Sequence, residues 1–447
     1  MKVRLRALEE RLRGSLFFVP MLFVVGAIVV GEAMLLLDER VDDVPRRFTS
    51  TVDSARSVLA LVGGATMTFA GIAFSVSLLL ISQASSQYSP RVVHGLFRDP
   101  FNKRVIGVVV GTFTYCLVVM RSVRGPLEGG GEPTIPNLAV AFAVVLGIVA
   151  ILATVAFISH VAHTLDVSTI LHRVTDESIA QVRAAWPESP DDGYEAHRAS
   201  ASTAIPDPTG DALVIAADTQ GWVQQIDEDR LLECIPPGTT LRLDTAAGRY
   251  AISGTPLAHW WPAPTGDDGA TRERAVTAAG ELVRSALVVG DTRTLQQDVS
   301  YGVRQIADVA LKALSPGVND PTTAQDAMFH LASVLEEILR REPPARRRTG
   351  DDGRVLIRGQ ALTHAEAIDL AFDEVRLAAA SQPTVLVYLL EILEQLVVAI
   401  GDRGDRRDAV DALRRQAALI LDTVALADLP DADSARVRAA YRHRFAT

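Results

Sequence analysis

The stretch LAVAFAVVLGIVAILATVAFIS, residues 138–159, decides the fold class of this chain. It contains no charged side chain and exceeds the about 20 apolar residues that a helix needs to cross a bilayer core. Three similar stretches precede it, at about residues 15–37, 57–82 and 103–120. We therefore predict an α-helical multi-pass membrane protein with four transmembrane helices in residues 1–164, the last at about 138–160.

The composition supports this interpretation and excludes a class of partner. The chain has 447 residues, 48% of them hydrophobic, and a formal net charge of −10. Its length suggests two or three domains, and its apolar excess lies in the first third. An acidic chain is a poor match for nucleic acid. Cys116 falls in an apolar segment and Cys234 in a polar region, which argues against a disulfide between them.

Two other apolar segments need a decision. The first span is too long for a cleaved signal peptide and no small-residue cleavage site follows it, so we interpret it as a retained anchor. Thr384–Ile400 reads TVLVYLLEILEQLVVAI, with Glu391 and Glu394 at its centre. Each carboxylate would cost on the order of 3 kcal/mol in a bilayer. We expect a buried helix there, not a fifth span.

The basic residues predict the orientation of the spans, because cytoplasmic loops are enriched in arginine and lysine. The N-terminal flank is basic, and the loop after the second span carries Arg91, Arg98, Lys103 and Arg104. The loop after the third span has only Arg121 and Arg124, although basic residues in the first loop weaken the contrast. We predict a bacterial inner (plasma) membrane protein with both termini in the cytoplasm.

The second span carries a stripe of small and weakly polar residues at helical spacing, Gly64, Thr68, Gly71 and Ser75. Such residues allow close helix packing, and hydroxyls can also line a pore. Both interpretations stay open here. In the third span, Gly107 and Gly111 form a GxxxG pair that is typical of a packing face.

Polar residues near the membrane also have two interpretations. Residues 91–98 alternate in the manner of an interfacial helix. Its Arg91 and Arg98, with Arg104, would contact lipid phosphates or form a basic ring at a pore mouth. His160, His163 and Asp166 have a spacing that could suit a metal or a pH sensor. No fourth ligand is evident, which favours a plain interfacial role.

The rest of the chain predicts a cytoplasmic α+β domain. Residues 165–210 read as a juxtamembrane helix and a linker. Residues 211–264 read as a small β-barrel-like module, weakly similar to a barrel-sandwich hybrid but without the lysine of a carrier domain. Residues 270–447 read as a helical domain, in which the T-x-x-E of Thr363–Glu366 predicts a capping box. Glu342–Arg354 reads as an exposed loop.

Two loops in the helical domain are candidate ligand sites. The segment ALSPGVNDPTTA contains a turn and the helix-start signature Asp320-Pro321, and free amides at a helix start can bind an anion. A structural corner is the competing interpretation. The upstream segment DTRTLQQD would supply neighbours. The candidate ligand residues are Arg293, Gln297, Asp298, Ser315, Asn319 and Asp320.

Four segments together resemble one bacterial family of predicted membrane proteins, catalogued as domain of unknown function 2254. They are QASSQYSPR, VVGTFTYCLVVMRSVR, DTRTLQQDVSYGVRQI and ALSPGVNDPTTA. The resemblance implies a multi-pass bacterial membrane protein and carries no functional residues over.

Three functions compete on the sequence alone. The first is a homo-oligomeric channel whose pore is lined by the second span and gated by the cytoplasmic domain. The second is a non-conducting membrane-anchored scaffold or sensor that binds a protein or small ligand. An enzyme is disfavoured, because no catalytic constellation is found. We expect the lipid bilayer as partner, and no cofactor, metal or nucleic acid.

Overall fold

The computed structural model describes residues 18–40, 50–87, 100–124, 135–164, 166–188, 208, 212–263, 269–360, 362–401 and 406–445. These residues divide into two compact units, with the boundary between Thr169 and Ile170. We call them the N-terminal unit and the C-terminal unit. Most of the described chain is helical, and a small sheet region lies in the C-terminal unit.

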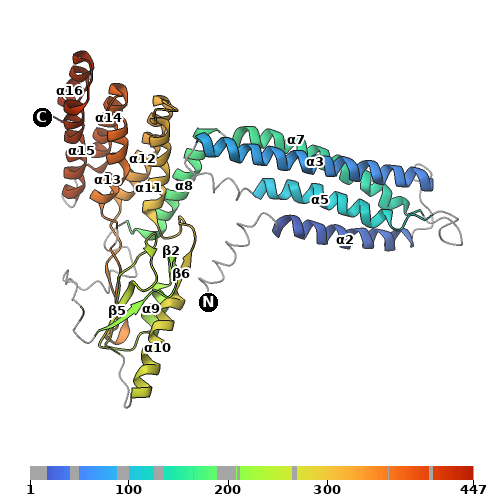
Figure 1. Ribbon diagram of the computed structural model, residues 1–447, viewed down its shortest axis with the longest axis horizontal. Coiled ribbons are helices and arrows are strands. Elements are labelled where there is room, and N and C mark those ends of the chain that lie inside the picture. The colour runs from blue at the N-terminus through green and yellow to red at the C-terminus, as the bar shows by residue number, and fades with distance from the viewer. Residues whose placement is uncertain are drawn as a thin grey trace. The chain divides into compact units, whose positions relative to one another are not determined.

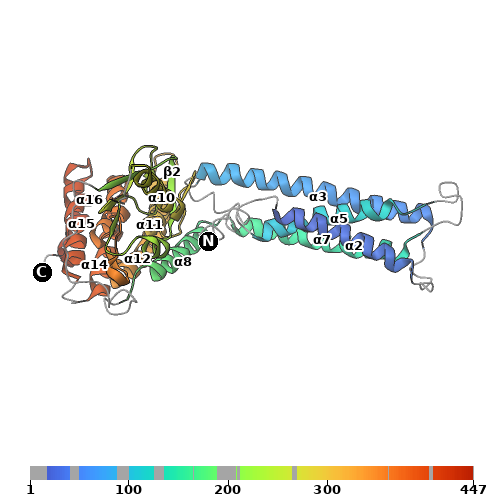
Figure 2. The ribbon, with the colours of Figure 1, turned by 90° about the horizontal axis from the view of Figure 1, so that it is seen from below.

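The described residues of the N-terminal unit contain four long helices that run side by side (Figures 1 and 2). They are α2 (Phe18–Asp38), α3 (Val52–Gln87), α5 (Pro100–Met120) and α7 (Asn137–Thr164). They coincide with the four predicted spans. Helix α5 contacts each of the other three and is the most buried of them.

By length and composition, five described helices could cross a membrane. Four are those of the N-terminal unit, and the fifth is α14 (Pro383–Ile400) of the C-terminal unit. The count therefore exceeds the four expected from the sequence, because α14 is also long and apolar enough to span a bilayer.

The GxxxG pair of α5 is a packing face, as predicted. A Cβ at Gly107 would lie 2.5 Å from the Phe23 ring of α2, and one at Gly111 would lie 3.3 Å from the Phe23 carbonyl oxygen. The two glycines thus let α2 approach α5 closely.

At one end of the bundle, α2 caps the start of α7. The Asp38 carboxylate accepts hydrogen bonds from the backbone amides of Leu138 (2.9 Å) and Ala139 (2.8 Å). Beside them, the Tyr115 hydroxyl donates to the Ala139 carbonyl at 3.0 Å. These bonds satisfy amides that a helix start otherwise leaves without partners.

The C-terminal unit contains most of helix α8 (Val167–Ala185), from Ile170 onward, and a sheet region. The β1-β5-β3-β8-β7 sheet contains Leu213–Ala216, Pro256–Trp261, Thr240–Leu243, Val355–Ile357 and Arg347–Thr349. The β4-β2-β6 sheet contains Tyr250–Ala251, Gly221–Ile226 and Leu287–Gly290. Helices α9 (Glu228–Cys234) and α10 (Gly269–Ala286) pack against these sheets.

The sheet region differs from the expected module in two respects. Its described strands form two sheets, so a single closed barrel is not seen. The sheets also include strands from beyond residue 264, the expected end of the module. Strand β8 pairs in parallel with β3, and β6 pairs with β2. The prediction that Glu342–Arg354 is only a loop was wrong, since β7 lies within it.

Six further helices form a two-layered array, visible in Figure 1. Helix α11 contacts α13 and α13 contacts α15, while α12 contacts α14 and α14 contacts α16. The helices are α11 (Val299–Ala313), α12 (Pro321–Arg340), α13 (His364–Ala378), α14 (Pro383–Ile400), α15 (Arg407–Leu426) and α16 (Asp431–Phe445). The predicted capping box at Thr363 and Glu366 is present and begins α13.

Candidate functional site

The four residues of the predicted stripe on α3 all face away from the N-terminal unit. Gly64, Thr68, Gly71 and Ser75 are exposed, and a Cβ at either glycine would meet no atom within 4 Å. Packing within the N-terminal unit therefore does not explain them. The opposite side of α3 carries out that packing, with Ala55, Leu59, Thr66 and Ala73 buried.

The stripe is longer than the sequence analysis recognised. Asp53, Ser57, Ala60 and Ser82 continue the same spacing of three or four residues and are also exposed. From Asp53 to Ser82 it extends roughly 44 Å at 1.5 Å per residue. Leu78 is the one large side chain on this line, so hydroxyls and small groups alternate over most of a bilayer's thickness.

Large apolar side chains border the stripe along both edges. They are highly exposed and comprise Leu61, Ile72 and Leu79 on one edge and Met67 and Phe74 on the other. The Thr68 hydroxyl donates to the Gly64 carbonyl at 3.0 Å and keeps its acceptor lone pairs available. The outward face of α3 is thus a narrow weakly polar line between two apolar edges.

Of the basic inner-loop candidates, Arg91 and Arg98 lie outside the described residues. Arg104 lies in the first turns of α5 and is exposed. At the other end of that helix, the exposed Arg121 pairs with Glu32 of α2 at 2.8 Å. Glu32 is therefore compensated locally.

The candidate ligand residues of the DTRTLQQD segment are engaged in structural contacts. Asp298 caps α11, and its carboxylate accepts from the Arg293 guanidinium at 2.6 and 3.1 Å. The same guanidinium lies over the rings of Trp222 and Tyr301. A side chain at Gly248 would collide with the Asp298 carboxylate, so glycine leaves the space for it.

Gln297, in the same segment, forms hydrogen bonds with strand β2. Its side-chain amide accepts from the Ile226 amide at 2.9 Å and donates to the Ile226 carbonyl at 3.1 Å. Its own backbone is left-handed, with φ of 59°. The segment joins strand β2 to helix α11, and sequence reasoning had no signal for this pairing.

The second candidate loop is a structural corner. Asp320 caps α12 through the amides of Thr322 and Thr323 and through the Thr323 hydroxyl. These bonds hold the pKa of the Asp320 carboxyl below its ordinary value, and the Thr323 hydroxyl contributes most. Asn319 accepts from the Gln382 side chain at 2.9 Å, and the Ser315 hydroxyl donates to the Lys312 carbonyl.

The two loops do not form one site. Asp298 caps the start of α11, whereas residues 314–320 follow its end, and the 15 residues of that helix separate them by roughly 22 Å. The expectation that they would be neighbours was wrong. Helix α11 lies between the two loops and holds them at its opposite ends.

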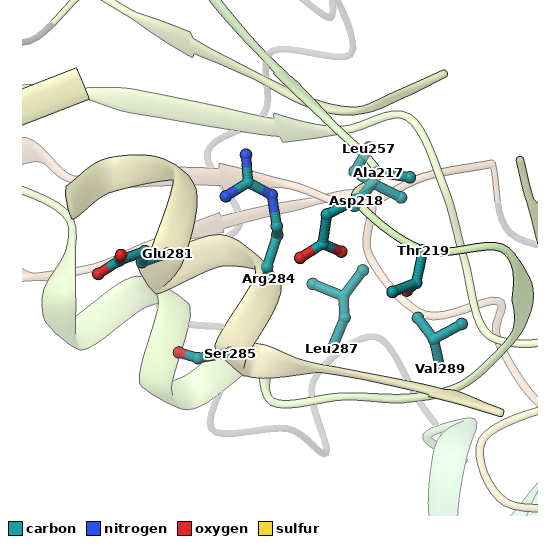
Figure 3. A pocket seen from close by; sticks show the side chains of 9 residues that line it. All are labelled: Ala217, Asp218, Thr219, Leu257, Glu281, Arg284, Ser285, Leu287 and Val289. Atoms are coloured by element: carbon teal, nitrogen blue, oxygen red, sulfur yellow. The ribbon is translucent and has the colours of Figure 1, made fainter. Parts of the chain in front are cut away.

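A pocket of about 460 Å³ lies beside α10, at the turn between β1 and β2. Its lining combines apolar and charged side chains (Figure 3): Ala217, Asp218, Thr219, Leu257, Glu281, Arg284, Ser285, Leu287 and Val289. The volume falls within the range of small-molecule sites. Sequence analysis did not find it, because its residues come from three separate segments.

Histidines join α8 to the helical array. The His330 ring lies 2.8 Å from the Thr175 hydroxyl and packs edge-on against His172, and burial lowers the His330 pKa. His364 donates from Nε2 to the Arg341 carbonyl and lies against Trp186, and burial lowers its pKa too. Neutral rings are favoured at both positions.

A metal site is not seen among the described residues, where no group of three His, Cys, Asp or Glu side chains could hold an ion. His160 of the sequence-derived trio lies against the Phe101 ring at a centroid distance of 4.6 Å. This contact favours its interfacial interpretation.

The chain matches a family model over most of its length. Residues 13–395 match the model of a family described as "Predicted membrane protein (DUF2254)". Uncharacterized protein Rv1290c of Mycobacterium tuberculosis and uncharacterized protein Mb1321c of Mycobacterium bovis are each 28% identical over 426 residues, which cover 94% of this chain and 78% of each relative. No solved structure matches the chain.

Proposed function

Since the chain belongs to the predicted membrane protein family DUF2254, we propose that it is a homo-oligomeric channel in which the α3 stripe lines the pathway. The proposal includes an inner-membrane location with both termini in the cytoplasm. The lipid bilayer and further copies of the chain are the partners, and no catalytic step is assigned.

The observation that carries the proposal is the outward position of Gly64, Thr68, Gly71 and Ser75. Apolar side chains are the groups that lipid solvates best, and hydroxyls and bare backbone are poorer lipid-facing groups. The N-terminal unit nevertheless turns this weakly polar line outward. Association of several copies around it would place hydroxyls along water and the bordering Leu61 and Met67 edges against neighbouring helices.

The proposed number of spans is four. Helix α14 has the hydropathy of a span, but it packs between α12, α15 and α16 of the array. Its Glu391 and Glu394 carboxylates lie 3.9 and 3.0 Å from the Arg444 guanidinium of α16. This environment supports a core helix, because the charges are paired within the unit and need no bilayer.

Cysteine accessibility tests the pathway. Cys116 and Cys234 would first be replaced by serine, and single cysteines then placed at Gly64, Thr68 and Ser75. The thiolate is the reacting form and is scarce in hydrocarbon, so reaction with a charged thiol reagent reports water. We expect faster reaction at these positions than at the edge positions Leu61 and Phe74.

Ion flux into liposomes that contain the reconstituted chain completes the test. Modification at Thr68 should reduce flux, whereas the same reagent should leave the Leu61→Cys variant unchanged. Equal inertness of both sets, with no flux from the unmodified chain, would reject the channel. It would leave a non-conducting scaffold or sensor.

A further inference from the structure

The α10 pocket contains an arginine, Arg284, whose position is fixed by a hydrogen bond through Nε. Nε of Arg284 donates to the Ala216 carbonyl of strand β1 at 3.1 Å. Within the part of the chain that the structure describes, this is the only hydrogen bond of the guanidinium. The Nη1 and Nη2 groups thus form a free fork, the geometry that binds a carboxylate through two parallel hydrogen bonds.

Gly280, one turn earlier on α10, creates the space for this guanidinium. A Cβ at Gly280 would lie 3.1 Å from both Nη1 and Nη2. The Arg284 side chain lies back along its own helix, held between the bare Gly280 backbone and the β1 carbonyl. Its orientation is therefore set by the protein before any ligand arrives, which lowers the entropic cost of binding.

The charged and apolar side chains around Arg284 indicate which other groups a ligand would carry. Figure 3 shows the Asp218 carboxylate beside the Arg284 side chain, while Glu281 projects to the other side of that arginine. Leu257, Leu287 and Val289 supply apolar surface to the same pocket. A ligand held by the fork would thus meet a carboxylate and an apolar wall together.

We propose that this pocket binds a zwitterionic amino acid with an apolar side chain. Its carboxylate would pair with the Nη1–Nη2 fork of Arg284, and its ammonium group would pair with Asp218. The aliphatic side chain would cover Leu287 and Val289. A phosphate dianion fits less well, because Asp218 and Glu281 would repel it.

This assignment goes beyond the proposed channel and concerns the C-terminal unit alone. Its test measures binding, so the result is independent of whether the chain conducts.

Titration calorimetry of the full chain in detergent with L-leucine provides the test. We expect saturable binding to the native chain, weakened about tenfold or more by Arg284→Gln and by Asp218→Asn, because each removes one charge-assisted contact. Arg274→Gln is the matched control. It removes an exposed arginine from the same helix, outside the pocket, and should leave the affinity unchanged.

Two analogues separate the ends of the ligand. 4-Methylpentanoate lacks the ammonium group, so its weaker binding should be sensitive to Arg284→Gln but not to Asp218→Asn. Isopentylamine lacks the carboxylate and should show the reverse pattern. Absence of leucine binding, or equal affinities in the native chain and both pocket variants, would overturn the proposal.

Folding of the pocket variants must be verified separately. Gly280→Ala keeps Arg284 and Asp218 but pushes on the guanidinium. It should weaken leucine while leaving the melting temperature within the range of the Arg274→Gln control. Unchanged leucine affinity in a folded Gly280→Ala variant would count against a preset fork.

Discussion

Helices α3 and α14 are equally apolar over their most hydrophobic stretches, yet their surroundings are opposite. In α3 large apolar side chains face outward, whereas the apolar side of α14 faces the core. The carboxylates of α14 pair with Arg444, and the central part of α3 has none. Hydropathy alone therefore does not separate a helix whose apolar side chains face outward from a helix whose apolar side chains face the core.

The largest expected effect comes from removing the same side chain in both helices. Leu393 of α14 is 0% exposed and Leu61 of α3 is 73% exposed. We expect Leu393→Ala to lower the free energy of unfolding of the C-terminal unit by about 2–5 kcal/mol. Leu61→Ala should change stability by about 0.5 kcal/mol or less. Urea unfolding of the full chain in detergent measures both, and equal losses would break the comparison.

Two glycines sharpen the contrast between packed and open surfaces. A side chain at Gly302 of α11 would collide with Ser178 of α8, whereas a Cβ at Gly64 meets nothing. Gly302→Ala should cost about 1–3 kcal/mol through overpacking. Ser178→Ala should recover part of this loss in the double variant. Gly64→Ala should leave the unfolding transition unchanged, and a lack of coupling between Gly302 and Ser178 would show that this contact is dispensable.

The corner at residues 315–320 gives a smaller effect. The sequence predicts a turn in ALSPGVNDPTTA, and the left-handed residue of that turn is Asn319, with φ of 47°. Gly317 has open space around its Cβ position. We expect Asn319→Val to cost about 1–2 kcal/mol. Gly317→Val and Asn319→Gly should cost less, as measured by thermal unfolding, and the opposite ranking would contradict the assignment.

The smallest effect is a pH dependence of the C-terminal unit. The pKa values of His330 and His364 are lowered by burial, so between the folded and the ordinary pKa the unfolded chain binds more protons. Stability should fall as pH drops below about 6.5, the ordinary histidine pKa. Melting temperatures between pH 7.5 and 5.5 measure the slope, which the His330→Gln, His364→Gln double variant should flatten. A steeper slope in that variant would reverse the sign.

Much of the fold could be predicted from local sequence. The four predicted spans coincide with α2, α3, α5 and α7, and the segments Gly221–Ile226 and Thr240–Leu243 are strands β2 and β3. The Asp320-Pro321 start and the Thr363 capping box also form as expected. Each of these signals is contained within one helix or strand and needs no knowledge of distant residues.

Contacts between residues far apart in the chain could not be predicted from the sequence. Strand β8 pairs with β3 although more than a hundred residues separate them in the chain. Gln297 likewise hydrogen-bonds to Ile226, although the whole of α10 lies between them in the sequence. A single sequence contains no register for such contacts. The pocket at Arg284 was missed for the same reason, because Asp218 and Leu257 approach it only after folding. The α3 stripe was found, since its spacing is local, but its ends at Asp53 and Ser82 were not.

The cap that Asp38 places on α7 also has a consequence for biosynthesis. Asp38 and Leu138, the first of its two partners in the sequence, are separated by 100 residues. At a synthesis rate of about 5–20 residues per second, roughly 5–20 seconds pass before these amides leave the ribosome. During that interval α2 holds an acceptor for a helix that has not yet been synthesised. The last helix of the bundle therefore closes the assembly, and a chain released before residue 137 would keep Asp38 without these two donors.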